Sequence, residues 1–99
     1  MISVKLHKSY RIVVAICDSN LLGKKFEEGI KQLDIRESFY KGKNISYQEA
    51  VKLIISQSKE DSTFNIVGEK SIGAAKKAGI IEDHGIGKIH DIPFALVLL

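Results

Sequence analysis

The apolar run from Ile12 to Cys17 places the strongest constraint on how this chain folds. The run is far shorter than the roughly 18 residues of a membrane span, and its β-branched residues favour a strand. A strand with apolar side chains on both faces belongs in the middle of a sheet, where neither face meets water. The sequence therefore predicts a central strand over residues 11–17.

The residues on either side of this run predict further short elements. Ile2, Val4 and Leu6 alternate with polar residues, which is typical of a half-buried strand, and a tight turn at 8–10 would join it to the central strand as a hairpin. Asp18 and the next two residues break the central strand and can cap a short helical turn. Residues 30–35 form a candidate strand, and residues 36–44 are expected to be a basic loop.

Two helices are predicted in the second half of the chain. Ser46 and Glu49 have the spacing of a capping box, in which each side chain bonds the other residue's backbone N–H, and apolar residues then recur at helical spacing to about residue 58. Residues 64–68 predict a short strand. A second helix is expected over 69–78, with Gly79 as a left-handed stop.

The remaining segments complete a single α+β domain over residues 1–99. Residues 80–82 form a strand or a docking segment, residues 83–88 a turn, and residues 92–99 an apolar strand in which Pro93 is tolerated at the start. We expect a small domain with a mostly antiparallel or mixed sheet and two helices packed on one face.

The chain is mildly basic, with a net charge of +3 and a pI near 9.0. Residues 1–43 hold nine basic and five acidic residues, whereas residues 44–99 hold six and seven. Such an asymmetry fits one side that faces a polyanion, and it also arises by chance. A single cysteine excludes an internal disulfide and fits a reducing compartment. With no signal peptide or membrane span recognised, we expect a cytoplasmic protein.

The basic loop RESFYKGKN at residues 36–44 carries the main RNA-binding hypothesis. Lysines and arginine neutralise phosphates, and an aromatic ring offers a face to an unpaired base. We expect Tyr40 to be the stacking ring; the competing interpretation buries Phe39 in the core and leaves Tyr40 at its rim. The proposed RNA-binding residues are Lys24, Lys25, Arg36, Tyr40, Lys41, Lys43 and Lys70.

The strand–glycine–helix junction NIVGEKS is a candidate anion site. The first N–H groups of a helix lack internal partners, and glycine lets a ligand approach closely, so Gly68 and Ser71 are the candidate anion-binding residues. An ordinary strand-to-helix turn is the alternative, and the carboxylate of Glu69 can occupy the same place.

The sequence contains no recognisable catalytic or metal-binding set. It has no Ser-His-Asp, HExxH or CxxC pattern, and Cys17 at the end of an apolar run is expected to be a buried, inert thiol. His84 and His90 lack a ligand spacing and are interpreted as surface loop residues. We therefore predict no cofactor and favour a non-enzymatic protein, although an enzyme built around Asp18 stays open.

The succession CDSNLLGKKFEEG, SFYKG and NIVGEKSIGAAKKAGII resembles the archaeal domain-of-unknown-function family 424, from about Val13 to Ala95. The resemblance implies a small cytoplasmic archaeal protein of one domain, with no established reaction. The family pattern has a histidine in a Val-Pro-His-Ala stretch where this chain has Phe94, so Phe94 cannot serve a chemical role of that histidine. The other matching positions are Asp18, Leu22, Gly23, Lys24, Phe26, Gly29, Phe39, Tyr40, Gly42, Asn65, Val67, Gly68, Ala75 and Gly79.

The leading functional hypothesis is a non-enzymatic RNA-binding protein associated with translation, with ribosomal RNA or the ribosome as its partner. An alternative is a protein–protein adaptor or a homodimer, formed through the apolar strand at 94–99. A third is a small-ligand or nucleotide-binding domain at the Gly68 junction. No membrane partner is expected.

Overall fold

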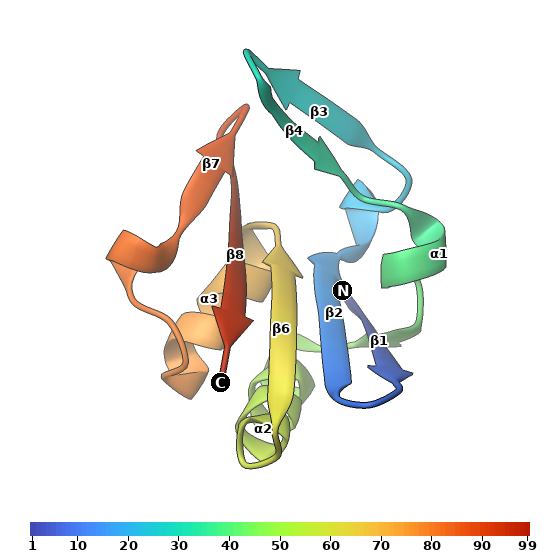
Figure 1. The fold of residues 1–99 in the computed structure, drawn as a ribbon, viewed down its shortest axis with the longest axis vertical. Helices are drawn as coiled ribbons and strands as arrows, with labels where there is room; N and C mark the ends of the chain where they lie inside the picture. The colour runs from blue at the N-terminus through green and yellow to red at the C-terminus, as the bar shows by residue number, and fades with distance from the viewer.

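The computed structural model describes residues 1–99, in which six strands form a mixed sheet with the order β5-β1-β2-β6-β8-β7 (Figure 1). The strands of this sheet are β1 (Ile2–Lys8), β2 (Ile12–Asp18), β5 (Lys43–Ile45), β6 (Ser62–Val67), β7 (Gly87–Ile89) and β8 (Ile92–Leu98). A separate hairpin consists of β3 (Lys25–Glu28) and β4 (Lys31–Asp34). The helices are α1 (Glu37–Tyr40), α2 (Tyr47–Ser58) and α3 (Glu69–Ala78), and two 3₁₀ turns lie at Ser19–Leu21 and Asp83–Gly85.

The predicted central strand is confirmed as β2, which pairs antiparallel with β1 and parallel with β6. Val14 and Ile16 belong to the core beneath the two long helices, whereas Ala15 and Cys17 belong to a second core on the opposite face. All four side chains are fully buried. The apolar character of both faces thus reflects two separate packing layers.

The two predicted helices are confirmed, and they cover one face of the sheet. Ser46 is the N-cap of α2, its Oγ accepts from the N–H of Glu49, and the Glu49 carboxylate accepts from the N–H of Ser46. Gly79 ends α3 in the left-handed conformation, with φ of 83°. Apolar residues of α2 and α3 pack on β1, β2, β6 and β8, so the expected α+β class with both helices on one face is correct.

The second face is covered only in part, by α1 and the β3-β4 hairpin (Figure 1). Leu33 of the hairpin, the following Ile35 and Tyr40 of α1 are buried against this face of the sheet. The expected loop at 36–44 is wrong, because α1 and β5 form there. The candidate strand at 30–35 is the second arm of a hairpin that turns at Gly29, where φ is 64°.

The two-residue turn between β7 and β8 holds the hairpin in place. Its residues, His90 and Asp91, both have positive φ values, 51° and 63°. The N–H of His90 donates to the Glu28 carboxylate at 2.9 Å, and the His90 ring contacts the carbonyl of Glu27. The segment at 83–88, expected to be a turn, contains a 3₁₀ turn and the first residues of β7. The strand β7 then leads directly into the turn at His90 and Asp91.

The apolar strand β8 has neighbouring strands on both sides in its first half and on one side only in its second half. Residues Ile92–Phe94 pair with β7, whereas the pairs from Ala95 to Leu98 involve β6 alone. The Pro93 carbonyl accepts from the N–H of Gly68, which follows the last residue of β6. The nitrogen of Pro93 points to the same side as its carbonyl. Its missing N–H therefore faces a place where the β6 ladder has already ended and needs no donor.

None of the helices combines the length and the apolar character that crossing a membrane requires.

The second core contains two weak acids whose pKa values are shifted in the same direction. Burial, with a further contribution from the Asp18 carboxylate, raises the pKa of Cys17 from 9.0 to about 12. Burial, followed by the proximity of Cys17, raises the pKa of Tyr40 from 10.0 to about 12. Both groups therefore keep their protons in the folded protein at pH values where the unfolded chain has lost them.

We predict that the protein loses stability as pH rises from about 9 to about 12, with little contribution from these two groups below pH 8. Above pH 9 the unfolded chain releases protons that the folded chain retains, so the free energy of unfolding falls. Thermal melts across this range measure the effect. Tyr40→Phe is expected to flatten the dependence, whereas Tyr10→Phe, at a fully exposed position, should leave it unchanged. Equal pH profiles for the two variants would contradict the assignment.

Candidate nucleic-acid interface

Four of the six predicted phosphate-binding cations lie around α1. The carbonyl of Lys24 accepts from the N–H of Ile35, and Lys25 pairs with Asp34 across the hairpin. Arg36 and Lys41 flank α1 at its two ends. Lys5 joins this group, because its Nζ donates to the carbonyl of Ser38 at 2.8 Å. We call this set the α1 surface: Lys5, Lys24, Lys25, Arg36 and Lys41.

Lys43 and Lys70 lie away from the α1 surface. Lys43 shares a face of β5 with Ile45, which packs beneath the helices. Hydrogen bonds from Ser46 lower the pKa of Glu49, and the charges of Lys43 and Lys52 add to that effect, so Lys43 is directed toward the start of α2. Lys70 lies in the first turn of α3, across the sheet from α1. These two cations do not extend the predicted cluster.

Tyr40 is buried, so it is not the base-stacking ring that the sequence predicted. Its side chain lies in the second core and is 8% exposed, while Phe39 is half-buried. The alternative arrangement, with Phe39 inside and Tyr40 at the rim, is also wrong. Neighbouring residues of a helix point about 100° apart. In α1 this difference directs Tyr40 into the core and leaves Phe39 at its edge.

The ring of Phe39 stacks on the imidazole of His7. The ring centroids are 4.6 Å apart and the planes differ by 15°, while the Nε2 atom of His7 lies 2.8 Å from the Phe39 carbonyl oxygen. Phe39 also meets Tyr40 edge-on, with centroids 4.9 Å apart. The half-exposed pair of Phe39 and His7 is therefore the aromatic surface available beside the cations.

The expected anion site at Gly68 and Ser71 is filled by the carboxylate of Asp18. The N–H groups of Lys70 and Ser71 and the hydroxyl of Ser71 all donate to this carboxylate, at 2.8 to 3.1 Å. A Cβ atom on Gly68 would lie 2.4 Å from the Asp18 carboxyl carbon. An external anion would have to displace a buried carboxylate, so the junction is a structural joint between β2 and α3 rather than a free anion site.

A cavity of about 480 Å³ lies next to this joint, at the carboxyl ends of the parallel strands β2 and β6. Its lining includes the start of the chain and the segments 18–21, 68–70 and 91–93. Carboxylates of Asp18, Glu69 and Asp91 face it, against one lysine, Lys70. This balance of charge disfavours a phosphate-bearing ligand.

Cys17, His84 and His90 are not assembled into one site. The raised pKa of Cys17, about 12, keeps its thiol protonated at neutral pH, as the predicted inert thiol requires. The His84 ring lies 3.9 Å from the Glu82 carboxylate on the surface, whereas His90 docks on the β3-β4 hairpin. The histidines thus occupy loops, as the sequence predicted.

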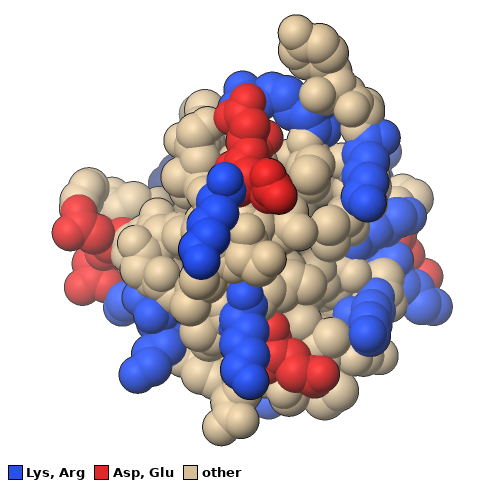
Figure 2. Space-filling view, turned by 90° about the horizontal axis from the view of Figure 1, so that it is seen from below, with Lys and Arg blue, Asp and Glu red and all other residues tan.

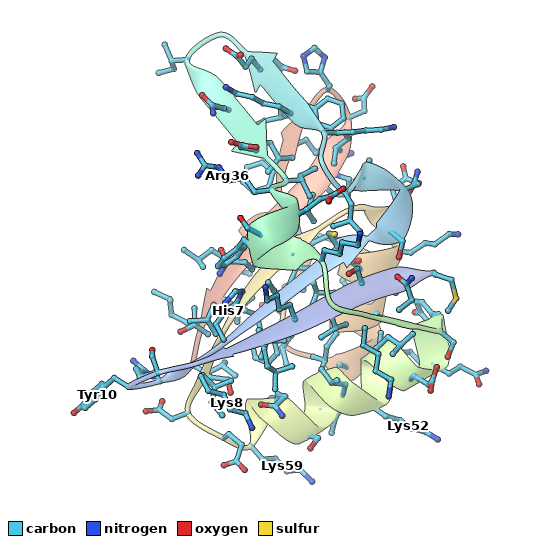
Figure 3. All side chains as sticks on the ribbon, turned by 90° about the vertical axis from the view of Figure 1, so that its right-hand side faces the viewer. His7, Lys8, Tyr10, Arg36, Lys52 and Lys59 are labelled. Carbon is cyan, nitrogen blue, oxygen red and sulfur yellow. The ribbon has the colours of Figure 1, made fainter.

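Basic side chains also occur outside the α1 surface. Figure 2 shows Lys and Arg side chains spread over the end of the molecule seen from below Figure 1, with Asp and Glu among them. Figure 3 shows Arg36 on the side of α1 and Lys52 and Lys59 on or next to α2, away from it. The charge asymmetry of the sequence is therefore only partly an asymmetry of the folded molecule.

Sequence reasoning missed the contribution of Lys5, His7, Thr63 and Asn65 to the second face. A signal was present for β1, because Lys5 and His7 alternate with the apolar residues that face the helices. The same signal was present for β6, because Thr63 and Asn65 alternate with Phe64 and Ile66, which pack beneath the helices.

We predict that Gly68→Ala destabilises the protein by about 3 kcal/mol or more, because it combines a positive φ of 108° with a clash against Asp18. Urea unfolding measures the change. Gly79→Ala is the matched control: φ there is 83°, and nothing lies within 4 Å of the added Cβ, so only the strain of about 1 kcal/mol applies. Equal losses in both variants would show that the contact with Asp18 is unimportant.

The comparisons with known proteins agree with this architecture. A family described as "Protein of unknown function (DUF424)" matches residues 7–99. The structure is similar to that of an uncharacterized conserved protein from Methanopyrus kandleri, with a TM-score of 0.81 and 25% sequence identity, over 98% of this chain and 91% of the other. No curated protein matches the chain. The match over nearly the whole chain shows that it belongs to the DUF424 family.

Proposed function

We propose that this protein is a non-enzymatic RNA-binding protein of the cytoplasm that acts in translation, with ribosomal RNA as its target. The observation that carries the proposal is the gathering of five cations around α1. Four of these side chains, all but that of Lys5, are exposed. They are free to reach phosphates without rearrangement of the core.

The electrostatics of the α1 surface support a polyanionic partner. Its five cations come with the carboxylates of Asp34 and Glu37, and with that of Glu27, which shares a face of β3 with Lys25. Asp34 accepts from Arg36 at 3.0 Å, in an exposed ion pair that contributes little to stability and leaves other guanidinium donors free. The surface therefore keeps an excess of positive charge that attracts a phosphate backbone.

The β8 strand favours a protein partner as the second candidate. From Ala95 to Leu98 it lacks a neighbour on one side, and Leu96 and Leu98 are 61% and 73% exposed. An apolar, uncharged edge strand is a site where another chain adds a strand. This would make the protein an adaptor or a homodimer.

We predict that the protein binds single-stranded RNA with a strong dependence on salt. About four phosphate contacts give a log–log slope near −3, so raising monovalent salt from about 50 to about 200 mM lowers the affinity by about 60-fold. Fluorescence anisotropy with a labelled fragment of single-stranded ribosomal RNA measures both quantities. Absence of binding at about 50 mM salt would refute the proposal.

A pair of triple variants locates the RNA contacts. Lys24→Gln, Lys25→Gln and Lys41→Gln together should reduce the slope to about −1 and weaken binding about tenfold or more at low salt. The control is Lys52→Gln, Lys59→Gln and Lys77→Gln, which changes net charge equally at exposed positions in and next to the long helices. Equal losses in both triple variants would show that net charge, rather than the α1 surface, holds the RNA.

Purification of the tagged protein from cell extract separates the two candidate functions. Ribosomal particles that are lost after nuclease treatment would support the RNA partner. Protein partners that survive the nuclease and are lost in Leu96→Glu would support the β8 strand instead.

A further inference from the structure

Two rows of side chains on the second face of the sheet are covered only in part. The strand registers place His7, Val13, Thr63 and Leu98 in one row and Lys5, Ala15, Asn65 and Leu96 in the next. A third row, formed by Ser3, Cys17, Val67 and Phe94, lies toward the hairpin. We call the first two rows the open half-face.

The boundary of the open half-face follows from what covers the third row. Ser3, Cys17 and Val67 are at most 2% exposed, and Cys17 and Val67 belong to the core that Leu33, Ile35 and Tyr40 close. In the lower rows Leu96 is 61% and Leu98 73% exposed, and Asn65 and Thr63 are half-buried. The cover thus reaches Ala15 in the second row, which is 0% exposed, and leaves mainly the β6 and β8 ends of the two rows open.

The chemistry of the open half-face is that of a surface without acids. Its eight side chains include one lysine and one histidine and no Asp or Glu. The side chains of Thr63 and Asn65, in its centre, form no hydrogen bond within the protein. An amide that offers a donor and an acceptor, and a hydroxyl that does both, match the edges of unpaired bases.

An aromatic pair lies at the rim of these rows. The half-exposed His7–Phe39 stack adjoins the lower row, and Tyr10 at the tip of the β1-β2 hairpin is fully exposed. Figure 3 shows Arg36, His7 and Tyr10 along one side of the molecule, on the side away from α2. Exposed rings next to a cation suit a nucleic-acid strand whose bases stack and whose phosphates meet positive charge.

The open half-face is continuous with the α1 surface. Lys5 belongs to both, because it lies in the second row and its Nζ reaches the Ser38 carbonyl of α1. We infer that the open half-face binds the unpaired bases of the same RNA whose phosphates the α1 surface holds, so that the substrate is single-stranded. This inference rests on the proposed function and names its substrate class.

The exposed leucines alone would equally suit a protein partner. The charge around them favours RNA: the rows have no acid, they share Lys5 with a cationic surface, and their central polar groups lack partners. A protein partner is therefore treated as an outcome of the test.

The test compares RNA affinities of two variants and two controls. Phe39→Leu and Asn65→Ala should each weaken binding of a single-stranded RNA decamer about fivefold or more. The salt slope should stay unchanged, because no phosphate contact is lost. Tyr47→Leu is the matched aromatic control, since Tyr47 is 43% exposed at the start of α2. A duplex of the same sequence should bind the unmodified protein at least tenfold more weakly than the single strand.

Three results would overturn the inference. If the variants bind within twofold of the unmodified protein while the Lys24, Lys25 and Lys41 variant loses affinity, the α1 surface acts alone and the proposed function survives. If duplex RNA binds as tightly as the single strand, bases are not read. If RNA does not bind at low salt, both proposals fail; a nuclease-resistant protein partner lost in Leu96→Glu would then assign the face to protein.

Chemical-shift mapping provides a readout that does not depend on the folding of a variant. On addition of the decamer to the unmodified protein, the side-chain amide of Asn65 and the backbone amides of 63, 65, 96 and 98 should shift. Shifts confined to residues 24–25 and 36–41 would contradict base binding at the sheet.

Discussion

The joint between the Asp18 carboxylate and the first turn of α3 determines how the two halves of this molecule fit together. Three donors from α3 converge on a side chain more than 50 residues earlier, and Gly68 makes room for it. A buried carboxylate is stable only where such donors replace water. The joint fixes α3 across β2 and β6, and with it the layer that closes one face of the sheet. The cations for which we propose a polyanionic partner lie on the other side of the sheet.

Elements whose signals are local were predictable from the sequence, and elements that depend on distant pairing were not. Ser46, Glu49 and Gly79 mark helix ends through bonds and conformations within a few residues, and α2 and α3 follow them closely. The strands β5 and β7 have three residues each and exist because β1 and β8 lie alongside them. No pattern within three residues carries that information.

The sequence predicted which basic residues of the candidate site are exposed, but not which of its aromatic side chains are. Basic residues at the surface keep their exposure in most folds, so Lys24, Lys25 and Lys41 needed only a common location. For Phe39 and Tyr40, exposure depends on the rotation of one short helix against the sheet, and adjacent residues then have opposite environments. The contact of the Asp18 carboxylate with the Gly68 junction could not be predicted from the sequence either. Asp18 precedes Gly68 by fifty residues, and the two residues meet only because β2 pairs in parallel with β6.

The turn at His90 and Asp91 has a consequence for the arm that carries Lys24 and Lys25. Two consecutive left-handed residues that are not glycine store strain, and such a turn persists only where its surroundings enforce it. The antiparallel pair Ile89–Ile92 encloses this turn, and the contacts of His90 with Glu27 and Glu28 join it to the β3-β4 hairpin. Glycine in place of Asp91 would adopt the same positive φ without the steric cost of a Cβ atom. The turn thus fixes the orientation of the β3-β4 hairpin, and of Lys24 and Lys25 at its base, relative to the six-stranded sheet.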